Sequence, residues 1–156
     1  MGKRMAAAGR WICFLYCLAM LWLLFGQRVG SGDYAGAFGS NMNLKPFSTI
    51  EWYWYVLKHV DTREHVRQAV INLAGNVVMF VPLGFFMPLL LPGVRKLFRF
   101  LVSAFGIILG IELFQLVTRL GCCDVDDVIL NLAGVLMGFS LYKLAELFSR
   151  WGRKAA

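Results

Sequence analysis

The sequence predicts an all-α integral membrane protein, a bundle of four transmembrane helices. The first observation is composition: of 156 residues, 59% are hydrophobic and only 16% are charged, against about 25% charged in an average soluble domain. The second is that four apolar runs each approach the roughly 20 residues that a helix needs to cross a bilayer. The third is a short internal repeat at the start of two of these runs. This composition excludes a disordered chain, a basic nucleic-acid-binding domain and most small soluble enzymes.

The four apolar runs place the expected spans at residues 9–26, 71–91, 98–117 and 128–148. The first run follows a basic N-terminus, but no small-residue cleavage site follows it, so we expect an uncleaved anchor rather than a signal peptide. Residues 27–70 are expected to form an outer segment between the first two spans. The Gly- and Ser-rich stretch 30–39 predicts a flexible link within that segment. The whole chain, 1–156, is expected to form a single membrane domain.

Basic residues near the ends of the spans predict the orientation of the bundle, because cytoplasmic loops are rich in Lys and Arg. Basic residues cluster at the N-terminus, in the link 95–99 and at the C-terminus, whereas the turn 121–127 carries three Asp and no basic residue. We therefore expect both termini on the cytoplasmic side of the membrane. The segment 27–70 and the turn 121–127 are expected on the extracytoplasmic side.

A four-residue repeat relates the second and fourth spans. The sequence Asn-Leu-Ala-Gly occurs at 72–75 and again at 131–134, each time where a span enters the membrane from the same side. Repeats with one orientation are typical of two units related by an axis along the membrane normal. We expect two helical hairpins packed as parallel repeats, with Asn72 and Asn131 in one outward-facing layer. Gly134 and Gly138 form a small-xxx-small pair, which predicts close helix packing.

The third span carries polar residues that need an explanation. Glu112 lies within the apolar run, and an acid at membrane depth costs on the order of 2.5–3.5 kcal/mol. Gln115 and Arg119 follow at i+3 and i+7, so all three residues are expected on one helical stripe. That stripe should face the bundle, because lipid would leave its polar groups unpaired.

The turn after this span carries three carboxylates and leads to an amide one helical turn into the fourth span: Asp124, Asp126, Asp127 and Asn131. One carboxylate suffices to cap a helix N-terminus. Three of them, beside Arg119, predict a polar pocket that opens outward. The adjacent cysteines at 122–123 lack the usual spacing of zinc ligands, and no metal site is predicted.

Several sequence blocks occur in order over most of the chain from residue 43 to residue 138. They are Asn-Leu-Lys-Pro-Phe-Ser-Thr-Ile at 43–50, Asn-Leu-Ala-Gly-Asn at 72–76, Phe-Val-Pro-Leu-Gly at 80–84, Glu-Leu-Phe-Gln at 112–115 with Arg119, and Asp-Val-Asp-Asp at 124–127 with Asn131 and Gly134. In these blocks the sequence resembles the VanZ-like family of small membrane proteins. The resemblance implies a multi-pass protein of the bacterial cell membrane and an association with resistance to the lipoglycopeptide teicoplanin.

The resemblance also implies a set of binding residues: Asn72, Asn76, Glu112, Gln115, Arg119, Asp124, Asp126, Asp127 and Asn131. Asn72 and Asn76 are expected to face the others from the paired hairpin. The chain differs from other members at Cys122-Cys123, where they usually carry a hydroxyl residue and an aromatic one.

Three functions fit these residues. The first is a membrane protein that lowers susceptibility to lipoglycopeptide antibiotics of the teicoplanin type through the outward-facing polar pocket. Its partners would be membrane lipids and the lipophilic glycopeptide or a cell-wall lipid precursor. The aromatic residues 52–55, typical of the headgroup level, would form an aromatic rim.

The second function is an intramembrane enzyme acting on a lipid or cell-wall precursor headgroup. Its candidate catalytic residues are Glu112, Asp126 and Asp127, with carboxylates that would hold a divalent cation and Arg119 that would hold a phosphate. The third is a small proton-coupled transporter with Glu112 as the titrating group. No cofactor and no nucleic-acid partner is predicted, and all three functions are compatible with a homo-oligomer.

Overall fold

The structure, a computed structural model, describes residues 3–26 and 42–155, with side chains described within 9–26 and 42–151. The flexible link expected at 30–39 lies outside the described residues. The elements in chain order are α1 (Lys3–Leu21), the π-helical turn η1 (Trp22–Gly26), β1 (Met42–Asn43), α2 (Ser48–His59), α3 (Arg63–Leu90), the 3₁₀ turn η3 (Pro92–Val94), α4 (Leu97–Thr118), β2 (Cys123–Asp124) and α5 (Val125–Ala155).

Four of these helical segments are long and apolar enough to cross a membrane: Gly9–Gly26, Arg63–Leu90, Leu97–Thr118 and Val125–Trp151. They correspond to the four predicted runs, so the all-α, four-span architecture is confirmed. α3 begins before its predicted span because a polar stretch from Arg63 continues into the apolar run as one helix.

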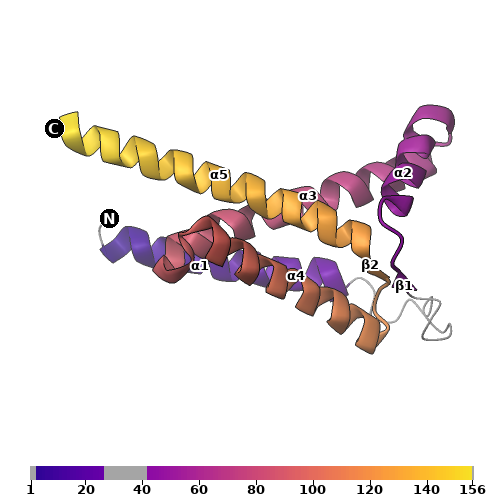
Figure 1. Ribbon diagram of the computed structural model, residues 1–156, viewed down its shortest axis with the longest axis horizontal. Coiled ribbons are helices and arrows are strands. Elements are labelled where there is room, and N and C mark those ends of the chain that lie inside the picture. The colour runs from indigo at the N-terminus through magenta and orange to yellow at the C-terminus, as the bar shows by residue number, and fades with distance from the viewer. Residues whose placement is uncertain (1–2, 27–41, 156) are drawn as a thin grey trace.

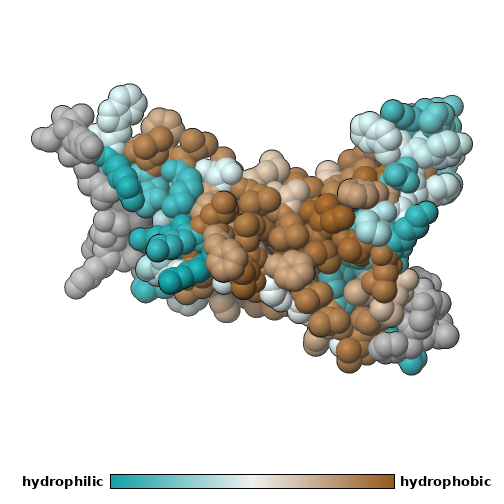
Figure 2. All heavy atoms as spheres, in the orientation of Figure 1, coloured by the Kyte–Doolittle hydropathy of each residue, from teal (hydrophilic) through white to brown (hydrophobic). Residues whose placement is uncertain are grey.

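The long helices lie side by side, and the start of α1 and the end of α5 lie at the same end of the bundle (Figure 1). We call this end the terminal end, and the opposite end, where α2, β1 and β2 lie, the α2 end. Figure 2 shows a broad hydrophobic surface between more polar surfaces at the two ends. This distribution is the one expected of a bundle whose middle lies in hydrocarbon and whose ends contact water.

The closest helix pair is α3 and α5, which run parallel and approach at backbone distance. A Cβ at Gly134 would overlap the carbonyl oxygen of Val77, and a Cβ at Gly138 would overlap that of Val81. Moving four residues along α5, from Gly134 to Gly138, moves the contact four residues along α3, from Val77 to Val81. The two helices therefore run in the same direction. The close packing predicted for Gly134 and Gly138 is confirmed, and small residues are what allow it.

The two copies of the repeat have different surroundings in the structure. Gly134 lies against α3, but a Cβ at Gly75 would have no neighbour within 4 Å among the described residues. Both copies lie in the half of the bundle nearest the α2 end, since Asn131 precedes Gly134 by one turn and Gly134 packs against Val77. The packing reason for glycine therefore applies to only one copy.

The core of the bundle is aromatic and aliphatic. Phe80, Phe100, Ile108 and Val135 are completely buried, and the ring of Phe139 stacks on Phe100 with centroids 4.3 Å apart. At the α2 end, β1 and β2 form a short parallel pair in which Asn43 is aligned with Asp124. This pair joins the segment before α2 to the turn before α5, and it positions the polar residues described next.

Candidate functional site

A cluster of acidic side chains occupies the α2 end of the bundle. Glu112 on α4, Asp124 on β2 and Asp126 in the first turn of α5 are 2%, 7% and 0% exposed. Burial of a charged group is costly unless hydrogen bonds and charges compensate it. The partners of each carboxylate therefore show what that side chain does.

Asp126 caps the N-terminus of α2 from a distant part of the chain. Its Oδ1 accepts the backbone N–H of Phe47 at 2.5 Å, and its Oδ2 accepts those of Thr49 at 2.8 Å and Ile50 at 3.1 Å. The first N–H groups of a helix have no partner within the helix, and a negative charge at that end is favourable. Asp126 is thus a capping residue for α2 rather than for its own helix, α5.

Asp124 binds the same segment through its side chain. Its Oδ2 accepts the Thr49 hydroxyl at 2.6 Å and the Asn43 amide at 3.2 Å, and its Oδ1 accepts the backbone N–H of Asp126 at 2.8 Å. The backbone N–H of Asp124 donates to Glu112 Oε2 at 3.3 Å. These bonds connect α4, β2 and the start of α2 into one network.

Asn43 and Thr49 were not among the residues that the sequence predicted for the site. Asn43 Nδ2 also donates to Thr49 Oγ1 at 2.8 Å and to Ser48 Oγ at 2.9 Å. The signal that points to them is the block 43–50, whose polar Asn, Ser and Thr stand among apolar residues. Their role in the structure is to hold α2 against the acidic turn.

Asp127 faces a different neighbour. Asn76 Nδ2 on α3 donates to Asp127 Oδ1 at 2.5 Å, and Asp127 is only partly buried. The expectation that Asn76 faces the acidic turn from α3 therefore agrees with the structure. Asp127 thus bonds to α3, whereas Asp124 and Asp126 bond to the segment leading to α2.

Asn76 also lines a groove between α1 and α3 with a volume of about 550 Å³. Most of the lining is apolar, and the polar side chains are Asn72 and Asn76 towards the α2 end and Tyr16 deeper in the groove. Tyr16 Oη donates to the backbone oxygen of Met79 at 2.7 Å. The hydrogen bond from Asn76 to Asp127 therefore joins the acidic turn to an apolar groove within the membrane-spanning region.

Asn72 and Asn131 have an unmet hydrogen-bonding requirement within the described part of the chain. The Oδ1 atom of each is buried and accepts no hydrogen bond there. Asn72 borders the groove, whereas Asn131 lies inside the bundle and is 2% exposed. An unpaired buried acceptor costs about 1–3 kcal/mol, so both positions call for an explanation other than packing.

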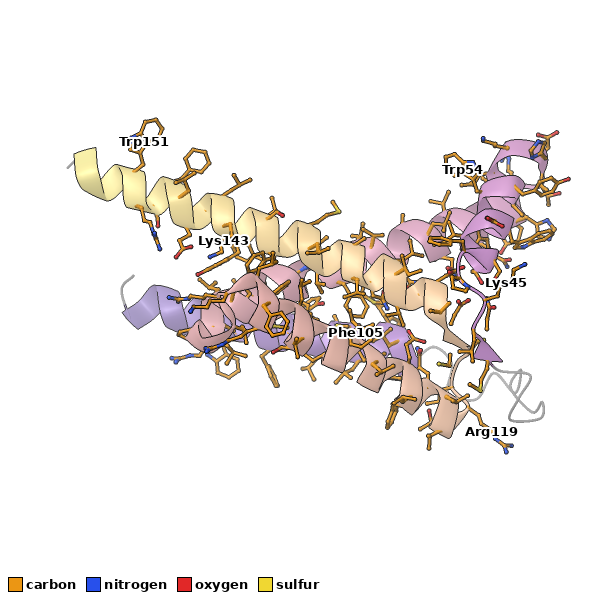
Figure 3. The ribbon with its side chains drawn as sticks, in the orientation of Figure 1. Lys45, Trp54, Phe105, Arg119, Lys143 and Trp151 are labelled. Carbon is orange, nitrogen blue, oxygen red and sulfur yellow. The ribbon has the colours of Figure 1, made fainter. Side chains whose placement is uncertain are left out.

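The structure brings Glu112 and Gln115 into the bundle but leaves Arg119 outside it. Both side chains on α4 are buried, at 2% and 4% exposed. Arg119 is exposed and points away from the bundle in Figure 3. The prediction of one inward-facing stripe is therefore wrong for Arg119. The reason is that α4 ends at Thr118, and Arg119 adopts a left-handed conformation with φ of 55°.

The charges of the cluster affect the neighbouring titratable groups. Burial raises the pKa of Tyr53 on α2, and the carboxylates of Asp127 and Asp124 raise it further. The Tyr53 hydroxyl therefore keeps its proton at neutral pH.

The pKa values of the two cysteines in the turn are also raised. Burial raises the pKa of Cys122, with further contributions from Asp124 and Asp127, and burial raises the pKa of Cys123, with contributions from Glu112 and Asp124. Because the thiolate is the reactive form, both side chains are weak nucleophiles in this environment. In the described residues, no three His, Cys, Asp or Glu side chains are arranged to hold a metal ion.

The fold and the site define a multi-pass membrane protein whose polar end is held together by its own carboxylates. The family model described as VanZ/LLP1 matches residues 12–146, and the chain belongs to this family. Protein VanZ from Enterococcus faecium is 26% identical to it over 149 residues, which cover 94% of this chain and 78% of the relative. No solved structure matches the chain.

Proposed function

We propose that this protein lowers the susceptibility of a bacterium to lipoglycopeptide antibiotics of the teicoplanin type, and that it acts at the extracytoplasmic face of the cell membrane. Membership of the VanZ/LLP1 family supports a link to glycopeptide resistance. The observation that carries the proposal is the hydrogen bond from Asn76 to Asp127, which joins the polar end of the bundle to the apolar groove between α1 and α3.

This arrangement suits an amphiphilic ligand. A lipoglycopeptide has a polar peptide and sugar part that stays in water and an acyl tail that enters the bilayer. In the proposed orientation, Asp127 and Asn76 lie near the headgroup level, and the groove continues from them into the hydrocarbon region between two spanning helices. A site with mostly apolar walls and a few placed polar groups is typical of small-molecule binding.

The acidic residues divide into two groups under this proposal. Asp124 and Asp126 hold the segment before α2, since their oxygens accept hydrogen bonds from residues 43–50. Asp127 bonds to Asn76, which lines the groove together with Asn72, and Asp127 is proposed to contact the ligand there. Of the residues that the sequence predicted for the pocket, the proposed ligand contacts are therefore those on the side of the turn that faces α3.

The test is the antibiotic susceptibility of a Gram-positive host that expresses the protein, with teicoplanin compared with vancomycin, which has no lipid tail. The amount of protein in the membrane is measured by immunoblot. We expect protection against teicoplanin and little or none against vancomycin, because only the tailed antibiotic presents an acyl chain to the groove. Equal protection against both antibiotics, or none against either, would contradict the proposal.

A further inference from the structure

Among the described residues, Gly75 has no packing contact that explains why it is glycine. Its counterpart in the repeat, Gly134, lies in backbone contact with Val77, whereas a Cβ at Gly75 would meet no described atom within 4 Å. Glycine inside a helix costs about 1 kcal/mol relative to alanine. What the missing side chain does provide is space, because Gly75 lines the groove between α1 and α3 beside Asn72 and Asn76.

The groove opens onto the lipid-facing surface of the bundle. Its walls are two membrane-spanning segments, and its rim carries the exposed side chains Leu23, Ile71 and Val78. The medium next to such a rim in the membrane is hydrocarbon rather than water. At about 550 Å³, the groove is within the range of roughly 300–1,000 Å³ that is usual for small-molecule sites. An acyl chain is therefore the group with access to it.

Apolar contact alone does not hold an acyl chain there. A lipid tail gains little by exchanging lipid neighbours for equally apolar side chains, so polar contacts have to supply selectivity. Asn72 borders the groove with an amide whose Oδ1 has no hydrogen-bond partner in the described chain. The Oδ1 atom is enclosed, so a headgroup O–H or N–H donor would meet this requirement once the Asn72 side chain turns toward the groove. The nearby carboxylate of Asp127 also favours a donor group over an acceptor group.

We propose that the groove binds one acyl chain of a membrane glycerolipid from the leaflet at the α2 end, with a hydroxyl or ammonium donor of its headgroup bonded to the Asn72 amide. The inference rests on the proposed function in using the same groove, and it adds a resident ligand that is present without antibiotic. A bound lipid of this kind occupies the space that an antibiotic tail would have to enter. Lipid binding is measured on purified protein, so its failure is distinguishable from a failure to confer resistance.

The test uses the full chain in phosphatidylcholine nanodiscs that contain a small fraction of a lipid with a photoactivatable diazirine on its acyl chain. The labelled lipid is phosphatidylglycerol, phosphatidylethanolamine or phosphatidylcholine in separate samples. Phosphatidylcholine has no O–H or N–H donor and controls for chain contact alone. After irradiation, mass spectrometry maps the labelled residues. We expect labelling concentrated in 16–24 and 71–82, and several times stronger with the two donor headgroups.

A matched pair of variants tests the role of the open glycine. Gly75→Leu places a side chain in the groove from a position where a Cβ meets no described atom within 4 Å, and Gly106→Leu makes the same change on α4, where a Cβ has the same open space but does not line this groove. We expect labelling of 16–24 and 71–82 to fall about tenfold in Gly75→Leu, the change that about 1.4 kcal/mol in binding produces, and to stay unchanged in Gly106→Leu. Ala19→Leu fills the groove from α1 and gives a second blocking variant if the first is poorly folded.

A separate variant tests the contact between the lipid headgroup and Asn72. Asn72→Leu keeps a side chain of similar size and removes the amide, so the preference for donor headgroups over phosphatidylcholine should disappear while chain labelling remains. Labelling spread evenly over α1, α3 and α4 would overturn the proposal, as would undiminished groove labelling in folded Gly75→Leu. Equal labelling by all three headgroups in the wild type would overturn the assignment of Asn72.

Discussion

Asp126 accepts the backbone N–H of Thr49 at 2.8 Å, although 77 residues separate them in the sequence. The same carboxylate accepts the N–H groups of Phe47 and Ile50, so one buried side chain from α5 satisfies the start of α2. The aspartates that stand out in the sequence as a group therefore have different tasks. Asp126 caps α2, Asp124 connects β2 with the segment before α2, and Asp127 bonds to Asn76, which lines the groove.

The first prediction concerns this cap. Asp126→Ala removes the acceptor for three backbone N–H groups, and replacement of a capping residue by alanine typically costs about 0.5–2 kcal/mol. We expect faster hydrogen exchange of the amides of Thr49 and Ile50, by about tenfold for each 1.4 kcal/mol of lost protection. Asp61→Ala, at an exposed acid between α2 and α3, is the control and should leave those amides unchanged. Equal protection in both variants would refute the assigned role of Asp126.

The second prediction concerns the hydroxyl of Thr49. Thr49→Val keeps the shape of the side chain but removes the donor to Asp124 Oδ2, which lies 2.6 Å away. Hydrogen bonds to charged groups contribute about 1.5–3 kcal/mol, so the thermal midpoint in detergent should fall. Thr62→Val, at an exposed position with no side-chain capping bond, should have a much smaller effect. A larger loss in Thr62→Val than in Thr49→Val would show that the network does not contribute as described.

The third prediction separates the two glycines of the repeat. Gly134→Ala introduces a Cβ against the Val77 carbonyl and should destabilise the α3–α5 pair, with overpacking typically costing about 1–3 kcal/mol. Gly75→Ala has open space and better helix propensity, so stability should stay the same or rise by up to about 1 kcal/mol. Unfolding in a mixed-detergent titration measures both. Similar losses in the two variants would contradict the difference in their surroundings.

The fourth prediction concerns pH and the thiols. Because burial and the nearby carboxylates raise the pKa of Cys122, its thiolate fraction is small at neutral pH, and alkylation should accelerate only at a pH above that needed for a free cysteine. Asp127→Asn removes one of the negative charges, which lowers this pKa and should speed alkylation of Cys122 at a fixed alkaline pH. Iodoacetamide labelling followed by peptide mapping measures the rate. A slower reaction in Asp127→Asn would contradict the conclusion that Asp127 raises the pKa of Cys122.

Hydropathy was enough to find the four spans, because the membrane requires a long apolar run from each helix. The site was harder to predict from the sequence, because the bonds of Asp126 and Asp124 to residues 43–50 depend on tertiary contacts between distant segments. Arg119 was misplaced because helical spacing was extended one residue past the end of α4. The contrast between Gly75 and Gly134 could not be read from two identical four-residue sequences, since it depends on which helix lies opposite.

We propose that Asp127, which bonds to Asn76 at the groove, is needed for the action of the protein on a lipid-tailed glycopeptide. The most direct measurement compares wild type, Asp127→Asn and Asp61→Asn in the same Gram-positive host, at matched amounts of membrane protein, for teicoplanin and vancomycin susceptibility. Both substitutions remove one negative charge, but only Asp127 bonds to Asn76 beside the groove. The account predicts teicoplanin-selective protection that Asp61→Asn retains and Asp127→Asn loses. Full protection by a well-expressed Asp127→Asn protein would contradict it.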